Sequence, residues 1–239
     1  MTLQSPRVML KLSGEVLAGT SKSGLNPAVL DTIANELTLA LTRGARAAVV
    51  LGGGNIFRGL GAAAKGMDRV TADQMGMLAT VINGLALRDA ILRAGGKSKL
   101  FTAFEVGKTG TVYTPERARK TIDKGAIAII SGGTGNPFFS TDTAAALRAA
   151  ELGCSLLLKG TKVDGVYDRD PEKFENAKRF DEITIDEALS LRVGVIDLTA
   201  ATLCRENKID IRVYRMTDPK VIVRAALGEP LGSLIKATD

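Results

Sequence analysis

The chain has 239 residues, of which 45% are hydrophobic and 24% charged, a balance typical of a globular protein with a full core. It contains no histidine, which excludes a Ser-His-Asp triad, a Cys-His pair and a histidine metal site. An enzyme of this composition must rely on Lys, Arg, Asp, Thr and backbone amides, a set that suits phosphoryl transfer.

The formal net charge of +6 invites a nucleic-acid interpretation. The basic residues are scattered, however, and aromatic residues make up only 4%, unlike the pattern of known RNA- and DNA-binding modules. We therefore expect no nucleic acid partner, and interpret the charge as a mildly basic surface that attracts a small polyanionic substrate.

Two further features bear on the cellular compartment. Met1–Pro6 is too short and polar for a signal peptide, and no apolar run approaches bilayer length, so we expect a cytoplasmic protein without a membrane partner. Cys154 and Cys204 lack a CxxC partner, and we interpret both as buried thiols rather than as a disulfide or metal ligands.

Apolar runs bounded by glycine predict strands that alternate with helices. The strands are expected at Arg7–Leu12, Ala47–Leu51, Ser98–Thr102, Ala126–Ser131, Ser155–Lys159 and Ile211–Tyr214. The helices are expected at Pro27–Arg43, Ala72–Ala94, Pro115–Lys124, Asp142–Glu151, Asp197–Asn207 and Pro219–Leu227. This order predicts the α/β class, with a mostly parallel sheet covered on both faces. We expect one continuous domain, with the polar stretch Arg169–Lys178 as a surface loop or a boundary between lobes.

Four loops follow predicted strands and carry most of the functional signal. They are Lys11–Gly14, Gly52–Gly59, the glycine loop within Ile129–Glu151, and Lys159–Tyr167. In an open parallel sheet, ligands bind at the carboxyl ends of the strands, so the four loops point to one site.

The glycine loops do not match the familiar nucleotide motifs. Two Gly-Lys-Ser/Thr sequences look like the end of a Walker A loop, but Ile91 and Thr102 stand where the first glycine is required. In the two glycine loops, Phe57 and Phe138 occupy the place of the third glycine of GxGxxG. A P-loop fold and a dinucleotide-binding fold are therefore both disfavoured.

The chemistry of the loop residues favours phosphate. Consecutive glycines let backbone N–H groups approach phosphate oxygens, and Arg58 can close bidentately on a phosphate. Lys11 leaves the end of a buried strand, where an ammonium group needs an anion. Asp142 cannot itself bind a phosphate, so we expect it to hold Mg²⁺ or to orient Lys11 and Lys159.

The stretch Asn136-Pro137-Phe138-Phe139 adds a second requirement. Asn136 offers a donor and an acceptor, as recognition of a pyrimidine edge requires, and the phenylalanines offer an apolar wall or core packing. Ser140-Thr141 can cap the following helix and donate to a phosphate. An aromatic base joined to a phosphate would use the whole loop, which predicts a nucleoside monophosphate as ligand.

At this point the chain resembles the bacterial UMP kinases, members of the amino-acid kinase superfamily. The resembling segments are KLSGE at Lys11–Glu15, GGGNIFRG at Gly52–Gly59, MDRVTADQMGMLATVINGLALRDA at Met67–Ala90, GTGNPFFSTD at Gly133–Asp142 and KVDGVYDRDP at Lys162–Pro171. KLSGE and the triple glycine recur across the superfamily, whereas the NPFF loop and Met67–Ala90 are more specific. The resemblance extends from about Arg7 to Gly232–Ile235, nearly the whole chain.

The resemblance implies a three-layer αβα sandwich formed by one domain over residues 1–239, with the UMP-binding part mainly amino-terminal and the ATP-binding part mainly carboxy-terminal. It implies a cytoplasmic, allosteric homohexamer that makes UDP and ADP from UMP and ATP with Mg²⁺ in pyrimidine biosynthesis. Leu92 stands where some members carry histidine near their GTP site, a departure that bears on GTP activation and UTP inhibition.

The resemblance also implies roles for individual residues. The catalytic residues would be Lys11, Arg58, Asp142 and Lys159. The ATP-binding residues would be Lys11, Leu12, Ser13, Gly14, Gly54, Arg58, Thr161, Tyr167 and Asp170. The UMP-binding residues would be Gly53, Asp73, Thr134, Gly135, Asn136, Pro137, Phe138, Phe139, Ser140 and Thr141, with Asp73 on the ribose. No protein ligand of the metal is assigned.

Three alternatives stay open at this stage. A related kinase could phosphorylate a carboxylate such as acetylglutamate, although such a substrate does not need the NPFF loop. A nucleotide sensor without turnover would be expected to lack Lys11, Lys159 or Asp142, and all three are present. An RNA-binding protein would be expected to carry an RNA-module signature.

Overall fold

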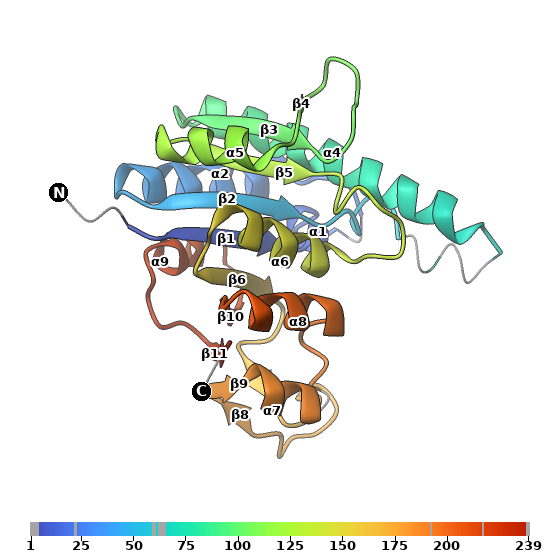
Figure 1. The fold of residues 1–239 in the computed structure, drawn as a ribbon, viewed down its shortest axis with the longest axis vertical. Helices are drawn as coiled ribbons and strands as arrows, with labels where there is room; N and C mark the ends of the chain where they lie inside the picture. Colours follow the sequence, from blue (N-terminus) through green and yellow to red (C-terminus); the bar gives the residue numbers. More distant parts are fainter. Residues whose placement is uncertain are drawn as a thin grey trace.

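The computed structural model describes residues 5–21, 23–58, 61, 66–191, 193–216 and 218–237. Within these residues, nine strands form one sheet in the order β4-β3-β5-β2-β1-β6-β10-β11-β9, and β7 pairs with β8 in a separate hairpin (Figure 1). All neighbours in the large sheet are parallel except β10 and β11. The strands are β1 (Arg7–Leu12), β2 (Arg46–Leu51), β3 (Ser98–Thr102), β4 (Thr111–Val112), β5 (Ile127–Ser131), β6 (Leu156–Thr161), β7 (Val166–Tyr167), β8 (Arg179–Phe180), β9 (Glu182–Thr184), β10 (Asp210–Arg215) and β11 (Ser233–Lys236).

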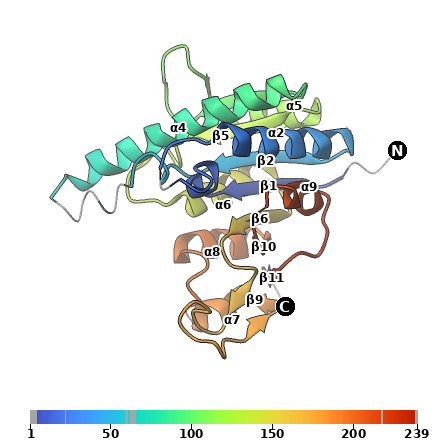
Figure 2. The same cartoon turned by 180° about the vertical axis from the view of Figure 1, so that it is seen from behind.

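Helices cover both faces of the sheet. On one face lie α5 (Pro115–Asp123), α6 (Thr141–Leu152), α7 (Ile185–Ser190) and α8 (Leu198–Glu206) (Figure 1). On the other lie α1 (Gly14–Leu17), α2 (Pro27–Thr42), α4 (Arg69–Arg93) and α9 (Val221–Ala226) (Figure 2). The three-layer αβα sandwich that the sequence predicts is therefore confirmed.

Strand β1 shows why two layers of helices are needed. Met9 packs into the core beneath α5, α6 and α8, whereas Val8, Leu10 and Leu12 pack into the core beneath α2 and α4. Because successive side chains of a strand point to opposite faces, a continuous apolar strand must be covered on both sides. The uninterrupted run of Ile127–Ser131, buried throughout, follows the same rule.

The main predicted elements are confirmed to within a few residues at their ends. Local capping explains several of these ends: Thr114 accepts from the Arg117 N–H before α5, and Asp197 accepts from the Ala200 N–H before α8. The short elements α1, α7, β4, β7, β8, β9 and β11 were not predicted. Each has six residues or fewer, too short for a periodic hydrophobic signal.

Helix α4 corrects the expectation about apolar runs. Its 25 residues include a window of mean hydropathy 1.4, long and apolar enough by composition to cross a bilayer. Residues such as Leu87 and Ile91 are buried beneath the sheet, and 44% of that window is buried inside the fold. The core helix of a globular domain has the same length and composition, so α4 by itself is weak evidence for a membrane span.

Candidate active site

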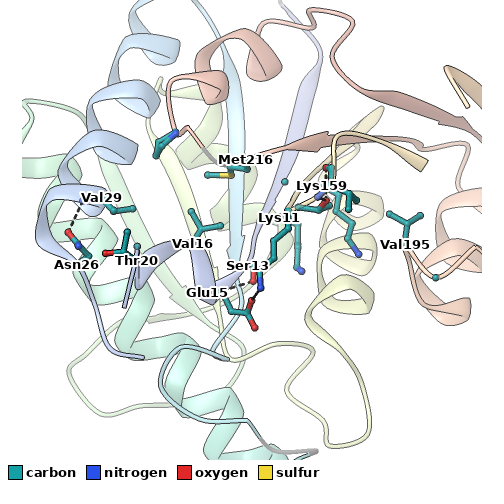
Figure 3. A pocket seen from close by; sticks show the side chains of 17 residues that line it. Lys11, Ser13, Glu15, Val16, Thr20, Asn26, Val29, Lys159, Val195 and Met216 are labelled. Carbon is teal, nitrogen blue, oxygen red and sulfur yellow. Dashed lines mark hydrogen bonds and ion pairs between the residues drawn. The ribbon is translucent and has the colours of Figure 1, made fainter. Parts of the chain in front are cut away.

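A cleft of about 730 Å³ opens where β1 and β6 end (Figure 3). Lys11 lines it from the end of β1 and Ser13 from just after that strand, and Lys159 and Thr161 line it from the end of β6. The parallel pairing of β1 with β6 brings these ends together, because it places the Cα of Lys11 opposite the Cα of Lys159. Two of the four predicted loops therefore meet here.

One carboxylate holds the two lysines. The Lys11 Nζ lies 2.9 Å from Asp142 Oδ1, and the Lys159 Nζ forms an ion pair with Asp142 Oδ2. The three side chains are only 11–16% exposed, so their charges are poorly screened by solvent. Of the two roles predicted for Asp142, orientation of the lysines is the one whose contacts are present.

The pKa values follow from this burial. Burial alone would raise the pKa of Asp142, but the charges of Lys11 and Lys159 outweigh it and hold the pKa below the ordinary value of 3.8. Burial lowers the pKa of Lys159 below 10.5, against the opposing pull of the Asp142 charge. The centre is thus a tightly coupled group with two cations and one anion.

The start of α6 supports Asp142. Ser140 is the N-cap residue, and its Oγ accepts from the N–H groups of Asp142 and Thr143, each at 3.0 Å. The Ser140 hydroxyl donates to the Asp197 carboxylate, which also accepts from the Thr143 hydroxyl at 2.9 Å. The sequence placed Asp197 only at a helix start. Its contact with Ser140 depends on α6 and α8 lying side by side, which the local sequence does not encode.

A second cleft, of about 710 Å³, lies beside the first and contains most of the predicted UMP residues. From the predicted set, it is lined by Gly53, Gly54, Arg58, Asp73, Thr134, Asn136, Phe138, Phe139, Ser140 and Thr141. Gly59, the last residue of the GGGNIFRG motif, lies outside the described residues.

Asp73 connects the helix side of this cleft with the NPFF loop. Its Oδ2 accepts from the Phe138 N–H at 2.8 Å and from the Arg69 Nε at 2.8 Å, and the Arg69 guanidinium lies 5.2 Å from the centre of the Phe138 ring. Phe138 has a φ of 72°, a left-handed conformation that is strained for a residue with a side chain. The Asp73 hydrogen bond and the Arg69 contact help to hold that conformation.

Glu15 lines both clefts and was not among the predicted site residues. Its carboxylate forms ion pairs with Arg58 and with Lys162, the latter at 2.7 Å. The hydrogen bond from Lys162 lowers the pKa of Glu15 below 4.5, and the charges of Lys162 and Arg58 act in the same direction. Its position in the KLSGE motif, next to the lysine strand, was the signal available in the sequence.

The triple glycine has a packing role in addition to the predicted one. A Cβ on Gly52 would come within 2.9 Å of the Gly14 N, and a Cβ on Gly53 would come within 2.8 Å of the Gly76 carbonyl oxygen. These two glycines are therefore required by close packing of the loop on its neighbours. Gly54 faces open space, with the nearest atom of Arg58 at 4.0 Å, and both Gly53 and Gly54 line the second cleft, where their backbone can approach a ligand.

A third cleft, of about 420 Å³, continues from the first and shares Val163, Gly194 and Val195 with it. Tyr167 and Asp170 line this third cleft, so the predicted ATP residues extend along two adjoining clefts. Five predicted residues do not line any of the three clefts: Leu12, Gly14, Gly135, Pro137 and Asp142, the last of which binds the two cleft lysines. Leu12 is fully buried and packs in the core instead.

Comparison with known proteins agrees with this geometry. Residues 6–215 match the amino acid kinase family. A uridylate kinase from Xanthomonas oryzae pv. oryzae is 48% identical over 230 residues, which cover 96% of each chain. The UMP kinase structure from Bacillus anthracis is 34% identical with a TM-score of 0.92, and the match covers 98% of this chain and 97% of the other. The UMP kinase structure from Ureaplasma parvum is 35% identical with a TM-score of 0.91, and the match covers 98% of this chain and 100% of the other. The chain therefore belongs to the amino acid kinase family and, within it, to the uridylate kinases.

Proposed function

We propose that the protein is a UMP kinase that transfers the γ-phosphoryl group of ATP to UMP, giving ADP and UDP. The observation that carries this proposal is the buried Lys11–Asp142–Lys159 centre beside two clefts of similar size. Two charged ligands must meet during phosphoryl transfer, and cations at their junction stabilise the charge that develops there. The full-length similarity to uridylate kinases supports the choice of acceptor.

ATP would occupy the first and third clefts. Its phosphates would lie near Lys11 and Ser13 in the first cleft, and its nucleoside would lie near Thr161 in that cleft and Tyr167 and Asp170 in the third. By the family resemblance, the backbone of Leu12, Gly14 and Gly54 would also approach the phosphates, with Gly54 doing so from the adjoining second cleft. UMP would occupy the second cleft. Its base and phosphate would contact the lining residues Gly53, Thr134, Asn136, Phe138, Phe139, Ser140 and Thr141, and its ribose would contact Asp73. By the family resemblance, Gly135 and Pro137 belong to the same UMP-binding run.

The reaction would be an in-line attack of a UMP phosphate oxygen on the γ-phosphate. That oxygen is already anionic at neutral pH, so no general base is required, in keeping with a chain without histidine. Lys11 and Lys159 would stabilise the charge on the transferred group, and Asp142 would hold both ammonium groups in place. Arg58 would reach the phosphates once it leaves Glu15.

The metal requirement is proposed to be Mg²⁺ that enters with ATP. Among the described residues, no group of three or more His, Cys, Asp or Glu side chains could hold a metal ion, and both Asp142 oxygens face lysines. This donor set fits an ion bound chiefly by nucleotide phosphate oxygens and water, as Mg²⁺ commonly is. The ion would neutralise phosphate charge, and we assign it no protein ligand.

We further propose that the chain acts as one domain in a cytoplasmic homohexamer in pyrimidine biosynthesis. The cleft for UMP is lined by residues from Glu15 to Thr141, whereas the ATP clefts use both halves of the chain. Met75, Leu78 and Ile82 are 39–47% exposed at helical spacing along α4, an apolar stripe that suits contact with a second copy. Light scattering should give six times the 25.1 kDa mass of the chain, and Ile82→Glu should reduce it.

The experiment that tests the function measures ADP formation from Mg·ATP with UMP, CMP, dUMP or acetylglutamate as acceptor. Strong selectivity for UMP is the expected result. Turnover with acetylglutamate alone would replace UMP by a carboxylate acceptor. A folded protein that binds ATP but turns over none of the four would be a nucleotide sensor.

A further inference from the structure

Helix α4 carries two buried polar side chains one turn apart, where its other inward residues are apolar. Thr80 is 2% exposed and Asn83 is fully buried, and both lie on the face that meets the sheet. Buried polar groups in a helix are costly unless they are hydrogen-bonded. The partners of Thr80 and Asn83 are the two glycine loops.

Asn83 is tied to the loop after β2. Its Nδ2 donates to the Gly52 carbonyl at 2.6 Å and to Asn55 Oδ1 at 2.7 Å. In return, Asn55 Nδ2 donates to Asn83 Oδ1 at 3.1 Å and to the Gly24 carbonyl at 2.8 Å. This reciprocal amide pair fixes the loop Gly52–Asn55 from both of its ends.

Thr80 is tied to the loop after β5. Its hydroxyl donates to the Met77 carbonyl at 2.7 Å, which leaves an oxygen lone pair to accept the Gly132 N–H at 2.7 Å. Gly132 is the first residue of the loop and has a φ of 85°, so the Thr80 bond fixes the point where the chain leaves the strand.

Glycines in the loop after β2 and on α4 allow both approaches to be close. A Cβ on Gly53 would come within 2.9 Å of the Ala79 Cβ, and a Cβ on Gly84 would come within 2.8 Å of the Leu100 side chain. Gly84 also packs directly on Ser131, the residue before Gly132. The contacts of Thr80 and Asn83 are thus made on a tightly packed surface with little room for slack.

We propose that Thr80 and Asn83 are positioning residues that divide the active site between them: Thr80 sets the Gly132–Gly135 loop of the UMP cleft, and Asn83 sets the Gly52–Gly54 loop that serves both nucleotides. This assignment of ligands to loops rests on the proposed function. The division follows from which loop each side chain bonds. It predicts that the two residues have different kinetic signatures although they lie on one helix.

The main variant is Thr80→Val, which keeps the shape and removes the acceptor for the Gly132 N–H. A buried N–H left without a partner weakens its loop, so the UMP KM and Kd should rise about 5- to 100-fold. The ATP Kd should stay within about twofold and kcat should change little, because the other loop is intact. Thr80→Ser keeps the hydroxyl and should restore UMP binding.

The matched control is Thr102→Val on β3. Thr102 is fully buried like Thr80, but its hydroxyl has no hydrogen-bond partner in the described part of the chain. The same substitution should therefore leave both KM values unchanged. Asn83→Leu should weaken UMP and ATP binding together. If it does not fold, Asn83→Ser gives the same comparison.

Hydrogen exchange separates this inference from the proposed function, because it needs no substrate. Thr80→Val should speed amide exchange in 131–139 and leave 52–58 unchanged, and the Asn83 variant should do the reverse. Exchange that rises equally in both segments for either variant would overturn the division. If the activity measurements with UMP, CMP, dUMP and acetylglutamate identify an acceptor other than UMP, that acceptor replaces UMP in the binding titrations. Loss of ATP binding in Thr80→Val would also overturn the inference.

Discussion

Lys11 and Lys159 are register partners on neighbouring parallel strands, and one carboxylate, Asp142, binds both ammonium groups. The same arrangement occurs at the opposite end of β1. Arg7 and Arg46 are register partners there, and both bind Asp123. The two centres differ in exposure, since the Asp142 side chain is 16% exposed and that of Asp123 is 42% exposed.

Asp142→Asn should inactivate and destabilise the protein. The change leaves two buried ammonium groups without an anion, and breaking a buried ion pair costs about 3 kcal/mol or more in unfolding free energy. Without their anchor, the lysines lose the geometry that stabilises transferred charge, so kcat should fall about 100-fold. Urea unfolding and initial rates measure the two effects.

Asp123→Asn is the matched control for that change. It also removes one carboxylate from between two cations, but at the exposed end of the strand. Its unfolding free energy should stay within about 1 kcal/mol of the parent, because exposed ion pairs contribute little. Activity should be unchanged. Equal destabilisation by both variants would show that burial is not what distinguishes the two centres.

The alkaline limb of the kcat profile should report on Lys159. Because burial lowers its pKa below 10.5, Lys159 loses its proton, and kcat falls, at a lower pH than an ordinary lysine would. The charge of Asp142 opposes this shift, so Asp142→Asn should move the limb to lower pH still. Initial rates from neutral to alkaline pH locate the alkaline limb in the parent and in the variant. A shift of the limb to higher pH in the variant would contradict the assignment.

The contribution of the Lys11–Asp142–Lys159 centre to the free energy of unfolding should depend on pH. The pKa of Asp142 is held below 3.8 in the folded protein, so its contribution is fully present above that value. The contribution is lost as the pH falls through the folded pKa. Lys159 acts in the opposite way: its lowered pKa costs stability that is fully present below the folded pKa, diminishes as the pH rises above that pKa, and is gone above the ordinary value of 10.5.

The sequence predicted the long elements and the charged centre for the same physical reason. Apolar runs locate parallel strands, and parallel strands place their carboxyl ends at one edge, so Lys11 and Lys159 were expected at the same edge. That β1 and β6 are direct neighbours, which brings the two lysines together, is seen only in the structure. The sheet pairing of β11 could not be predicted, because its four residues carry no periodic signal and one of its two partners, the parallel strand β9, precedes α7, α8 and β10 in the chain.

The contacts of Thr80 and Asn83 illustrate a second limit of prediction from the sequence. The sequence placed Thr80 and Asn83 inside a long helix but not opposite the loops that they bond. One signal was available: both are polar residues within an otherwise apolar inward stripe, one turn apart. Their partners follow only from how the helix packs on the sheet, which depends on the whole chain.

Lys11→Met should separate turnover from binding. The ammonium group lies at the transfer centre, so kcat should fall about 100- to 1,000-fold when it is removed. UMP binding, measured by calorimetry without ATP, should change by less than about twofold, because Lys11 lines the other cleft. Lys120→Met, on the exposed face of α5, is the control with the same chemistry. Undiminished turnover would remove Lys11 from the catalytic set.

The two cysteines should be inert in the folded protein. Burial raises the pKa of both Cys154 and Cys204 to about 12, from an ordinary value of 9.0. At pH 8 a thiol reagent should therefore react only after unfolding, and in guanidinium chloride it should titrate both. Because the unfolded thiols ionise first, stability should fall as the pH rises above 9.0, by about 1.4 kcal/mol per pH unit for each thiol. Rapid labelling of the native protein would contradict this.

Asp73→Asn should weaken UMP selectively. The carboxylate lines the UMP cleft and accepts the Phe138 N–H, so the change removes a charged acceptor from both the ribose and the NPFF loop. A lost hydrogen bond to a charged group corresponds to a rise of about 10- to 100-fold in the UMP KM. The ATP KM should stay within about twofold. Asp89→Asn is the control, since Asp89 also pairs with an arginine four residues away on α4 but is 70% exposed. Equal losses for UMP and ATP would place Asp73 outside the UMP site.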